Sequence, residues 1–223
     1  LAWVRFCEQL KEAGRIPFRN GVPSGDLSRA AGFRCLAQNI GLGVQFHLEN
    51  NDPLHPELLH YFDPIHKQGG DNPDAVYVGG PINGYDTYRI RGNRGTARYF
   101  SVTAVETGTT PWGGGVASVL LGDDLTIEED GTFELICSPD PHPGNWLKTS
   151  ADTFRVTFRQ FFADWENERP MRASIERIHA DPAPKPVMDP ERLSNGLDAV
   201  SRWVGDSLHY WADMIERWKA RPN

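Results

Sequence analysis

Cysteine is scarce in this chain, and the thiols that occur are far apart. Cys7, Cys35 and Cys137 are an odd number in 223 residues. Their spacing matches neither the dense disulfide frameworks of small secreted domains nor a zinc knuckle. The chain also lacks an Asn-x-Ser/Thr glycosylation acceptor. These absences together predict a protein of a reducing, cytoplasmic compartment.

Long apolar runs and an excess of basic charge are missing as well. No stretch approaches the roughly 18 consecutive apolar residues that a membrane span requires, so we expect no membrane partner. The 23 Lys and Arg residues are outnumbered by 30 Asp and Glu residues, which gives a formal net charge of -7. Because nucleic-acid binding depends on clustered cations, we expect no nucleic-acid partner. No signal-peptide pattern begins at Leu1, although a leader removed before it stays an open alternative.

Signature motifs of nucleotide-dependent enzymes and of serine hydrolases are absent. Gly79-Gly80 and Trp112-Gly-Gly-Gly115 are not followed by Lys-Ser/Thr, so neither predicts a phosphate-binding loop. No Gly-x-Ser-x-Gly elbow occurs. We therefore expect no cofactor.

The hydrophobic pattern divides the chain into a helical segment (1–68), a β-rich segment (69–180) and a proline-rich linker with a long helix (181–223). In the first segment, apolar residues at helical spacing predict a helix that Gly14 ends. Ser24 is expected to cap a second helix that carries Asp26 in its first turn. His55-Pro56 predicts a short third helix that runs through Leu59.

The middle segment consists of short alternating runs separated by Gly, Pro, Asn and Asp, which is typical of antiparallel strands with tight turns. We predict strands near Ala75–Gly79, Thr87–Arg91, Ala97–Val105, Val116–Leu121, Leu125–Glu128, Thr132–Cys137, Thr153–Phe161 and Arg172–Ile178. So many strands favour two packed sheets over one open sheet. The expected fold is α+β: an antiparallel, jelly-roll-like β-sandwich of about eight strands, with an N-terminal helical segment and a long C-terminal helix.

The final segment begins with the stiff linker Asp181–Pro186. Asp189 and Pro190 are then a good cap and first residue for a helix of some thirty residues, about 45 Å long. Its apolar stripe is expected to pack within its own chain or, alternatively, to form a homodimer contact.

The middle of the chain resembles a bacterial family known only as a domain of unknown function (DUF1214), over roughly residues 69–176. The stretches that carry the resemblance are Gly70–Tyr77, Thr87–Gly92, Asp130–Glu134, Gly144-Asn-Trp-Leu147 and the strand Phe154–Arg159. The resemblance implies a β-sandwich of jelly-roll type and implies no catalytic mechanism.

Histidines and carboxylates are concentrated in one short region. Its members are His47, Glu49, Asp52, His55, Glu57, His60, Asp63 and His66. A carboxylate beside a histidine fixes the imidazole tautomer and moves its pKa, as acid–base catalysis requires. We predict His60, Asp63 and His66 as catalytic residues, with a histidine as proton carrier and Asp63 as its orienting partner. Metal binding with His142, or purely structural histidines, are the alternatives.

A second group of residues combines aromatic walls with a few polar groups, as small-molecule pockets do. The predicted ligand-binding residues are Asp74, Tyr77, Tyr88, Arg89, Trp112, Asn145, Trp146 and Arg159. Turn formation and a solvated sheet face explain many of them equally. Arg155 and Arg159 project on one strand face, either into solvent or as a clamp for an anionic ligand.

The leading functional hypothesis is an enzyme or binder for a largely apolar, oxygenated organic molecule, using acid–base chemistry without a nucleotide cofactor. As an enzyme it would be a lyase or hydrolase with a His/carboxylate pair. The alternative is a non-catalytic carbohydrate-binding or scaffold β-sandwich that self-associates through its C-terminal helix.

Overall fold

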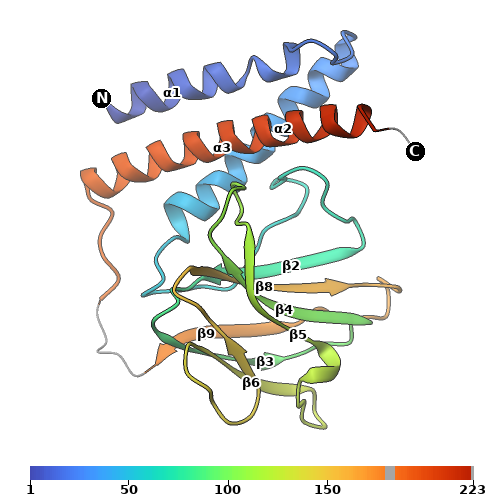
Figure 1. Ribbon diagram of the computed structural model, residues 1–223, viewed down its shortest axis with the longest axis vertical. Helices are drawn as coiled ribbons and strands as arrows, with labels where there is room; N and C mark the ends of the chain where they lie inside the picture. Colours follow the sequence, from blue (N-terminus) through green and yellow to red (C-terminus); the bar gives the residue numbers. More distant parts are fainter. Residues whose placement is uncertain (179–183, 222–223) are drawn as a thin grey trace. The chain divides into compact units, whose positions relative to one another are not determined.

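Two β-sheets and a group of helices make up residues 1–178 and 184–221, which the computed structural model describes (Figure 1). They fall into two units. Unit 1 comprises Leu1–Glu49, Phe62–Asp71 and Pro186–Asn223, and unit 2 comprises Asn50–Tyr61 and Asn72–Lys185. The C-terminal helix thus belongs to the same unit as the N-terminal helices. The first half of the predicted linker, 181–183, lies outside the described residues.

The described part of unit 2 forms nine strands in two sheets. Sheet A has the order β1-β2-β8-β4-β5 and sheet B the order β7-β6-β3-β9. The strands are β1 Leu59–His60, β2 Ala75–Pro81, β3 Thr87–Asn93, β4 Tyr99–Glu106, β5 Gly115–Leu121, β6 Thr132–Ser138, β7 Trp146–Lys148, β8 Thr153–Phe161 and β9 Arg172–Ile178. Neighbouring strands pair antiparallel, except for the parallel pair β6–β7.

Side chains from the inner faces of both sheets form one core. Val156 and Phe158 of β8 are fully buried and belong to the same cluster as Leu135 of β6. The rings of Phe100 in sheet A and Phe133 in sheet B lie 6.2 Å apart, centre to centre. Strand alternation places these residues inward, because successive side chains point to opposite faces. The predicted α+β class, with two sheets and helical segments at both ends, is confirmed.

One predicted strand does not form. Residues 125–128 follow the 3-10 turn Gly122–Asp124 without pairing to a strand. The backbone N–H of Thr126 donates to Asn145 Oδ1 (2.8 Å), and Asn145 Nδ2 donates back to Thr126 O (2.9 Å). An amide side chain therefore takes the place of a strand partner. The other predicted strands are present, whereas the short strands β1 and β7 escaped prediction.

Three long helices form unit 1: α1 Ala2–Ala13, α2 Asp26–Val44 and α3 Pro190–Lys219; a 3-10 turn, Ile16–Phe18, follows α1, and a π-helical turn, Gln45–Glu49, extends α2. Gly14 ends α1 as predicted. The predicted cap of α2 is wrong, because the helix begins one residue later with Gly25 at the cap position and no side-chain cap bond.

The predicted third helix is also wrong. The Asp52 carboxylate accepts from the backbone N–H of Leu54 at 3.0 Å and contacts His55 Nδ1 at 3.1 Å. Such local side-chain bonds hold a turn and compete with helix formation. Farther on, Leu59 and His60 pair with Gly79 and Val78 of β2.

Helix α3 packs on the other helices of its unit. Asp189 caps it as predicted, accepting from the backbone N–H groups of Glu191 (2.9 Å) and Arg192 (2.8 Å). Arg5 of α1 forms an ion pair with Asp198 at 2.6 Å. Trp218, near the end of the predicted apolar stripe, remains 60% exposed. Among the described helices, none is both long and apolar enough to cross a membrane.

Tyr88 yields a prediction about alkaline stability. Its hydroxyl is buried, donates to Pro53 O (2.9 Å) and accepts from the backbone N–H of Asn83 (3.0 Å). Burial raises the pKa of Tyr88 from 10.0 to about 12. A raised phenol pKa contributes stability that is complete below pH 10 and is lost as the pH rises towards 12. Tyr88→Phe should therefore flatten the fall in unfolding free energy over this window.

Urea unfolding at a series of pH values checks this expectation. Tyr85→Phe, at a position 75% exposed, is the matched control. Equal slopes for the parent and Tyr88→Phe would contradict the assignment.

Candidate functional site

Asp63 and His66, two of the predicted catalytic residues, lie side by side in unit 1. Asp63 Oδ2 contacts His66 Nδ1 at 2.9 Å, and Oδ1 accepts from the backbone N–H groups of Ile65 (2.7 Å) and His66 (2.8 Å). Burial alone would raise the pKa of the Asp63 carboxyl, but these hydrogen bonds outweigh it and hold the pKa below its ordinary value. The turn thus orients the imidazole through its Nδ1 atom, as acid–base chemistry needs.

The same arrangement recurs in unit 2, at Asp52 and His55. There the carboxylate and Nδ1 are 3.1 Å apart. Both pairs occur in an Asp-Pro-x-His sequence, a repeat that could have identified them without a structure. His60, the third predicted catalytic residue, lies exposed on β1 in unit 2, whereas Asp63 and His66 belong to unit 1. Within the described residues, no three His, Cys, Asp or Glu side chains converge as metal ligands would.

Several predicted ligand-binding residues hold the sandwich together. Tyr88 has no exposed surface, so its ring offers no wall to a surface ligand. Arg89 forms an ion pair with Glu176 of the neighbouring strand at 2.6 Å. Asp74 is exposed in the turn before β2, where its N–H donates to Asn72 Oδ1 at 2.9 Å. Trp112 is half-buried in the β4–β5 loop.

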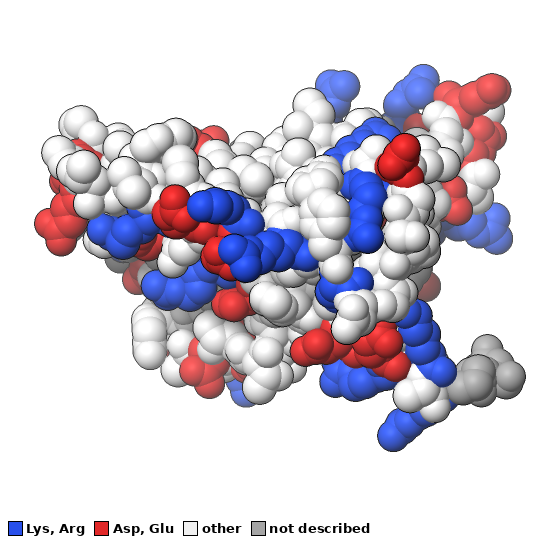
Figure 2. All heavy atoms as spheres, turned by 90° about the horizontal axis from the view of Figure 1, so that it is seen from above, with Lys and Arg blue, Asp and Glu red and all other residues white. Residues whose placement is uncertain are grey.

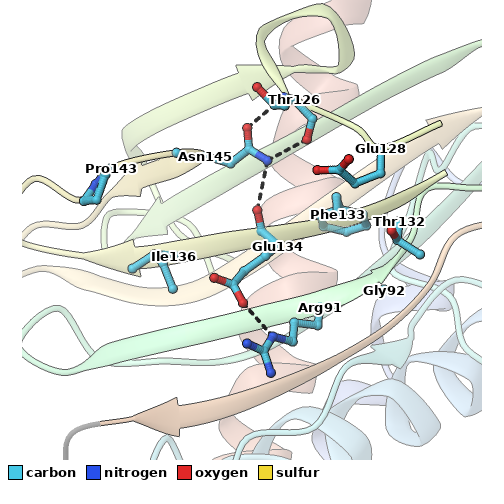
Figure 3. A pocket seen from close by; sticks show the side chains of 11 residues that line it. Arg91, Gly92, Thr126, Glu128, Thr132, Phe133, Glu134, Ile136, Pro143 and Asn145 are labelled. Carbon is cyan, nitrogen blue, oxygen red and sulfur yellow. Dashed lines mark hydrogen bonds and ion pairs between the residues drawn. The ribbon is translucent and has the colours of Figure 1, made fainter. Parts of the chain in front are cut away.

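Asn145 lines an open hollow of about 620 Å³ on sheet B (Figure 3), and Trp146 follows it as the first residue of β7. Asn145 Nδ2 donates to Thr126 O and to Glu134 O, both at 2.9 Å, so its two amide hydrogens are used within the fold. The nearby Glu134 carboxylate accepts from Arg91 Nε at 2.6 Å. Trp146 donates its indole N–H to Ser138 Oγ at 3.0 Å. These polar groups therefore already have hydrogen-bond partners within the fold.

Tyr77 and Arg159 are brought together on the outer face of sheet A. They are direct partners in the antiparallel pair β2–β8, and Gly79 lies opposite Thr157 on the same face. A Cβ at Gly79 would lie 2.6 Å from the hydroxyl oxygen of Tyr61, so the missing side chain makes room for that phenol. Tyr61, which escaped prediction, therefore lies on this face.

Four side chains meet there, and we call them the Tyr61 cluster: Tyr61, Arg155, Thr157 and Arg159. The hydroxyl oxygens of Tyr61 and Thr157 are 2.7 Å apart. The Arg155 guanidinium carbon lies 5.6 Å from the centre of the Tyr61 ring, within the range of a cation–π contact. Tyr61, Arg155 and Thr157 are 4%, 9% and 7% exposed, whereas Arg159 is exposed. The cluster thus runs along β8 from a buried end to an accessible one.

Burial perturbs both titratable groups at the buried end. It raises the pKa of the Tyr61 phenol, although the charge of Arg155, the bond to Thr157 and the charge of Arg159 oppose the shift. Burial lowers the pKa of Arg155, and the Tyr61 phenol opposes this. The neutral Tyr61 phenol therefore lies near the guanidinium groups of Arg155 and Arg159. All three groups can donate hydrogen bonds to an oxygen atom of a ligand. Perturbed groups gathered in this way mark candidate functional sites.

Comparison with known proteins places this site in context. Residues 77–164 match the model of a family described as "Protein of unknown function (DUF1214)", which confirms the resemblance over this segment. The segment contains Tyr77, Arg155, Thr157 and Arg159 but not Tyr61. A search of the curated proteins finds no match.

Two solved structures are similar to the chain. One is an uncharacterised protein from Burkholderia cenocepacia, 32% identical with a TM-score of 0.90; the match covers 99% of this chain and 61% of that one. The chain thus spans about three fifths of that relative's length. The other is a protein from Vibrio parahaemolyticus, 14% identical with a TM-score of 0.34, covering 77% of this chain and 42% of that one.

Gly79→Ala should damage the site and the fold together. The added Cβ would lie 2.3 Å from Val156 O and 2.6 Å from the Tyr61 hydroxyl, so backbone or ring must move. Overpacking of this kind typically costs about 1–3 kcal/mol in unfolding free energy. Gly205→Ala is the matched control, because a Cβ there meets nothing within 4 Å. That control should gain about 0.5–1 kcal/mol, as expected for Gly→Ala inside a helix. Chemical unfolding measures both, and a neutral Gly79→Ala would refute the close approach.

Proposed function

We propose that this chain binds a small organic molecule through an oxygenated, negatively charged group, and that the Tyr61 cluster holds that group. The supporting observation is the buried contact between the Arg155 guanidinium and the Tyr61 phenol, with Thr157 at 2.7 Å from the phenol oxygen. Guanidinium groups recognise carboxylates and related oxyanions through paired N–H donors.

The order of groups along β8 suggests how such a ligand would be held. The exposed Arg159 meets the anionic group first, and Tyr77 lies directly across from it. Deeper along the strand, Tyr61 and Thr157 supply hydroxyls beside the buried Arg155. In a desolvated environment these donors interact more strongly with an anion than they would in water.

The protonation state of Tyr61 suits the stabilisation of negative charge on an oxygen atom. Its raised pKa keeps the phenol protonated, so it can donate a hydrogen bond to a developing oxyanion. This role needs no nucleotide cofactor. In our proposal for unit 2, Tyr61 as a hydrogen-bond donor takes the place of His60.

Ligand binding can be tested without knowing the ligand. Small molecules that copurify with the protein are identified by mass spectrometry and then added back to ligand-free protein. A genuine ligand at about 100 times its Kd stabilises the folded state by about 2.7 kcal/mol, which a thermal melt detects. Arg159→Gln and Arg155→Met should abolish this shift, whereas Arg98→Gln, at an exposed position, should retain it.

Arg155→Met serves as the decisive variant. Methionine is long and apolar, so it removes a buried charge while keeping most of the packing. Replacing a buried charge by an apolar side chain is often neutral or stabilising. A folded Arg155→Met protein that still binds the ligand would overturn the proposal.

A second candidate function is supported by the pair of Asp63 and His66 at 2.9 Å. In this proposal His66 is a general acid or base in a lyase or hydrolase reaction, and Asp63 is its positioning residue. With a ligand identified as a substrate, His66→Ala should lower kcat by a factor of about 10² or more. Asp63→Asn should change the pH profile of kcat. His142→Ala, in an exposed loop, is the control, and unchanged turnover in His66→Ala removes this candidate.

Finer expectations from the sequence are retained here as proposals. They are a jelly-roll connectivity of the sandwich, a bacterial origin and a cytoplasmic location. The non-catalytic alternative, a carbohydrate-binding or scaffold sandwich with a homodimer contact on α3, has some support in Trp218 and Leu193, which are 60% and 42% exposed.

A further inference from the structure

A groove in unit 1, outside the Tyr61 cluster, has the features of a separate binding site. It is open to solvent, has a volume of about 830 Å³ and is lined by α1, the turn that follows it and α3. This volume is in the range of small-molecule sites. Buried small or apolar residues contribute to its lining: Ala13 is 4% exposed, Ile16 9% and Ala212 7%.

The middle of the groove is open because a glycine lies there. Gly205 is inside α3, yet a Cβ built on it meets no atom within 4 Å. Glycine destabilises the interior of a helix relative to alanine, so helix stability does not explain why a glycine occurs at position 205. A larger side chain at this position would project into free space and fill the groove.

Helices α1 and α3 run in the same direction, so residues that follow one another along α1 face residues that follow one another along α3. Arg5 contacts Asp198, Gln9 contacts Ser201, and Lys219 donates to Gly21 O farther along. The groove therefore begins near Gln9 and ends beyond Ile16.

One donor atom of a cationic side chain in the lining has no hydrogen-bond acceptor in the part of the chain that the structure describes. Arg19 donates through Nη1 to Ile16 O at 3.3 Å, but its Nε atom is shut off from solvent and has no acceptor among the described residues. Buried donors in native proteins are nearly always paired, so such an atom calls for an explanation. Arg19 lines the groove, so a small movement of its side chain would let a carboxylate oxygen in the groove accept from the guanidinium.

Two of the four acidic side chains in the lining remain available to bind a positively charged group of a ligand. Glu12 already pairs with Arg15 at 3.1 Å, and Glu8 with Lys11 at 3.3 Å. Asp206 and Asp213 line the groove without an ion pair to any described residue. On the face shown in Figure 2, acidic and basic side chains likewise lie next to one another rather than in separate patches.

We propose that this groove binds a small zwitterion of the amino-acid type. The carboxylate of the ligand pairs with Arg19, and its ammonium group pairs with Asp206 or Asp213. A purely anionic ligand would meet the two aspartates, and a purely cationic one would meet Arg19 and its neighbours. A molecule that carries both charges can pair with both kinds of group.

Calorimetry and thermal melts of the whole chain test this proposal with the twenty common L-amino acids, each up to roughly 10 mM, a range that detects weak binding. At least one should bind. The analogues of that amino acid that lack the amine or the carboxylate should bind at least about tenfold more weakly. Absence of binding by every amino acid, or equal binding of a single-charge analogue, overturns the proposal.

Variants locate the binding. Gly205→Phe should remove it by filling the groove, and Gly205→Ala should weaken it less. Arg19→Gln should weaken it at least about tenfold, while Arg34→Gln, at an exposed position on α2, should leave it unchanged. Binding that survives both Gly205→Phe and Arg19→Gln in folded protein would place the ligand elsewhere and refute the site. The outcome is independent of the Tyr61 cluster, which belongs to unit 2.

Discussion

The alternation of side chains along β8 joins the core of unit 2 to its candidate site. Val156 and Phe158 point into the core between the sheets, while Arg155, Thr157 and Arg159 point to the outer face. The pairing of β8 with β2 and β4 therefore does two things at once. It closes the apolar core, and it aligns the polar groups of the Tyr61 cluster. A shift of one residue in this pairing would exchange the two sets and destroy both.

The buried Arg155 is the member of the Tyr61 cluster whose burial costs most. Removing a guanidinium from water costs several kcal/mol even after the protein relaxes. The contacts of the guanidinium with the rings of Tyr61 and Phe154 offset part of that cost, since a desolvated cation–π contact is worth about 2 kcal/mol or more. The packing around Tyr61 also depends on Gly79, a residue that weakens a strand interior. A buried charge and a strand-interior glycine at one place are features that local sequence rules disfavour, and such features are expected at functional sites.

Sequence reasoning succeeded where the determining contacts are local or periodic. The bounds of β8 and β9 and the start of α3 follow from alternation and from a cap at Asp189. It failed where the local structure depends on a residue far away in the sequence. The hydroxyl groups of Tyr61 and Thr157 are in contact although the two residues are 96 positions apart in the sequence, and no local pattern predicts that contact. Residues 125–128 alternate like a strand, yet the side chain of Asn145 takes up their backbone hydrogen bonds.

The two Asp-Pro-x-His turns show why a local concentration of histidines and carboxylates in a sequence is a weak indication of function. Each Asp-His contact forms within three residues, so the dyad geometry arises from the turn itself. Such a turn orients a histidine whether or not a substrate ever reaches it. The Tyr61 cluster differs, because its members come from strands and loops that only the folded core brings together. A costly arrangement of distant residues is therefore the stronger indication of a binding site in this protein.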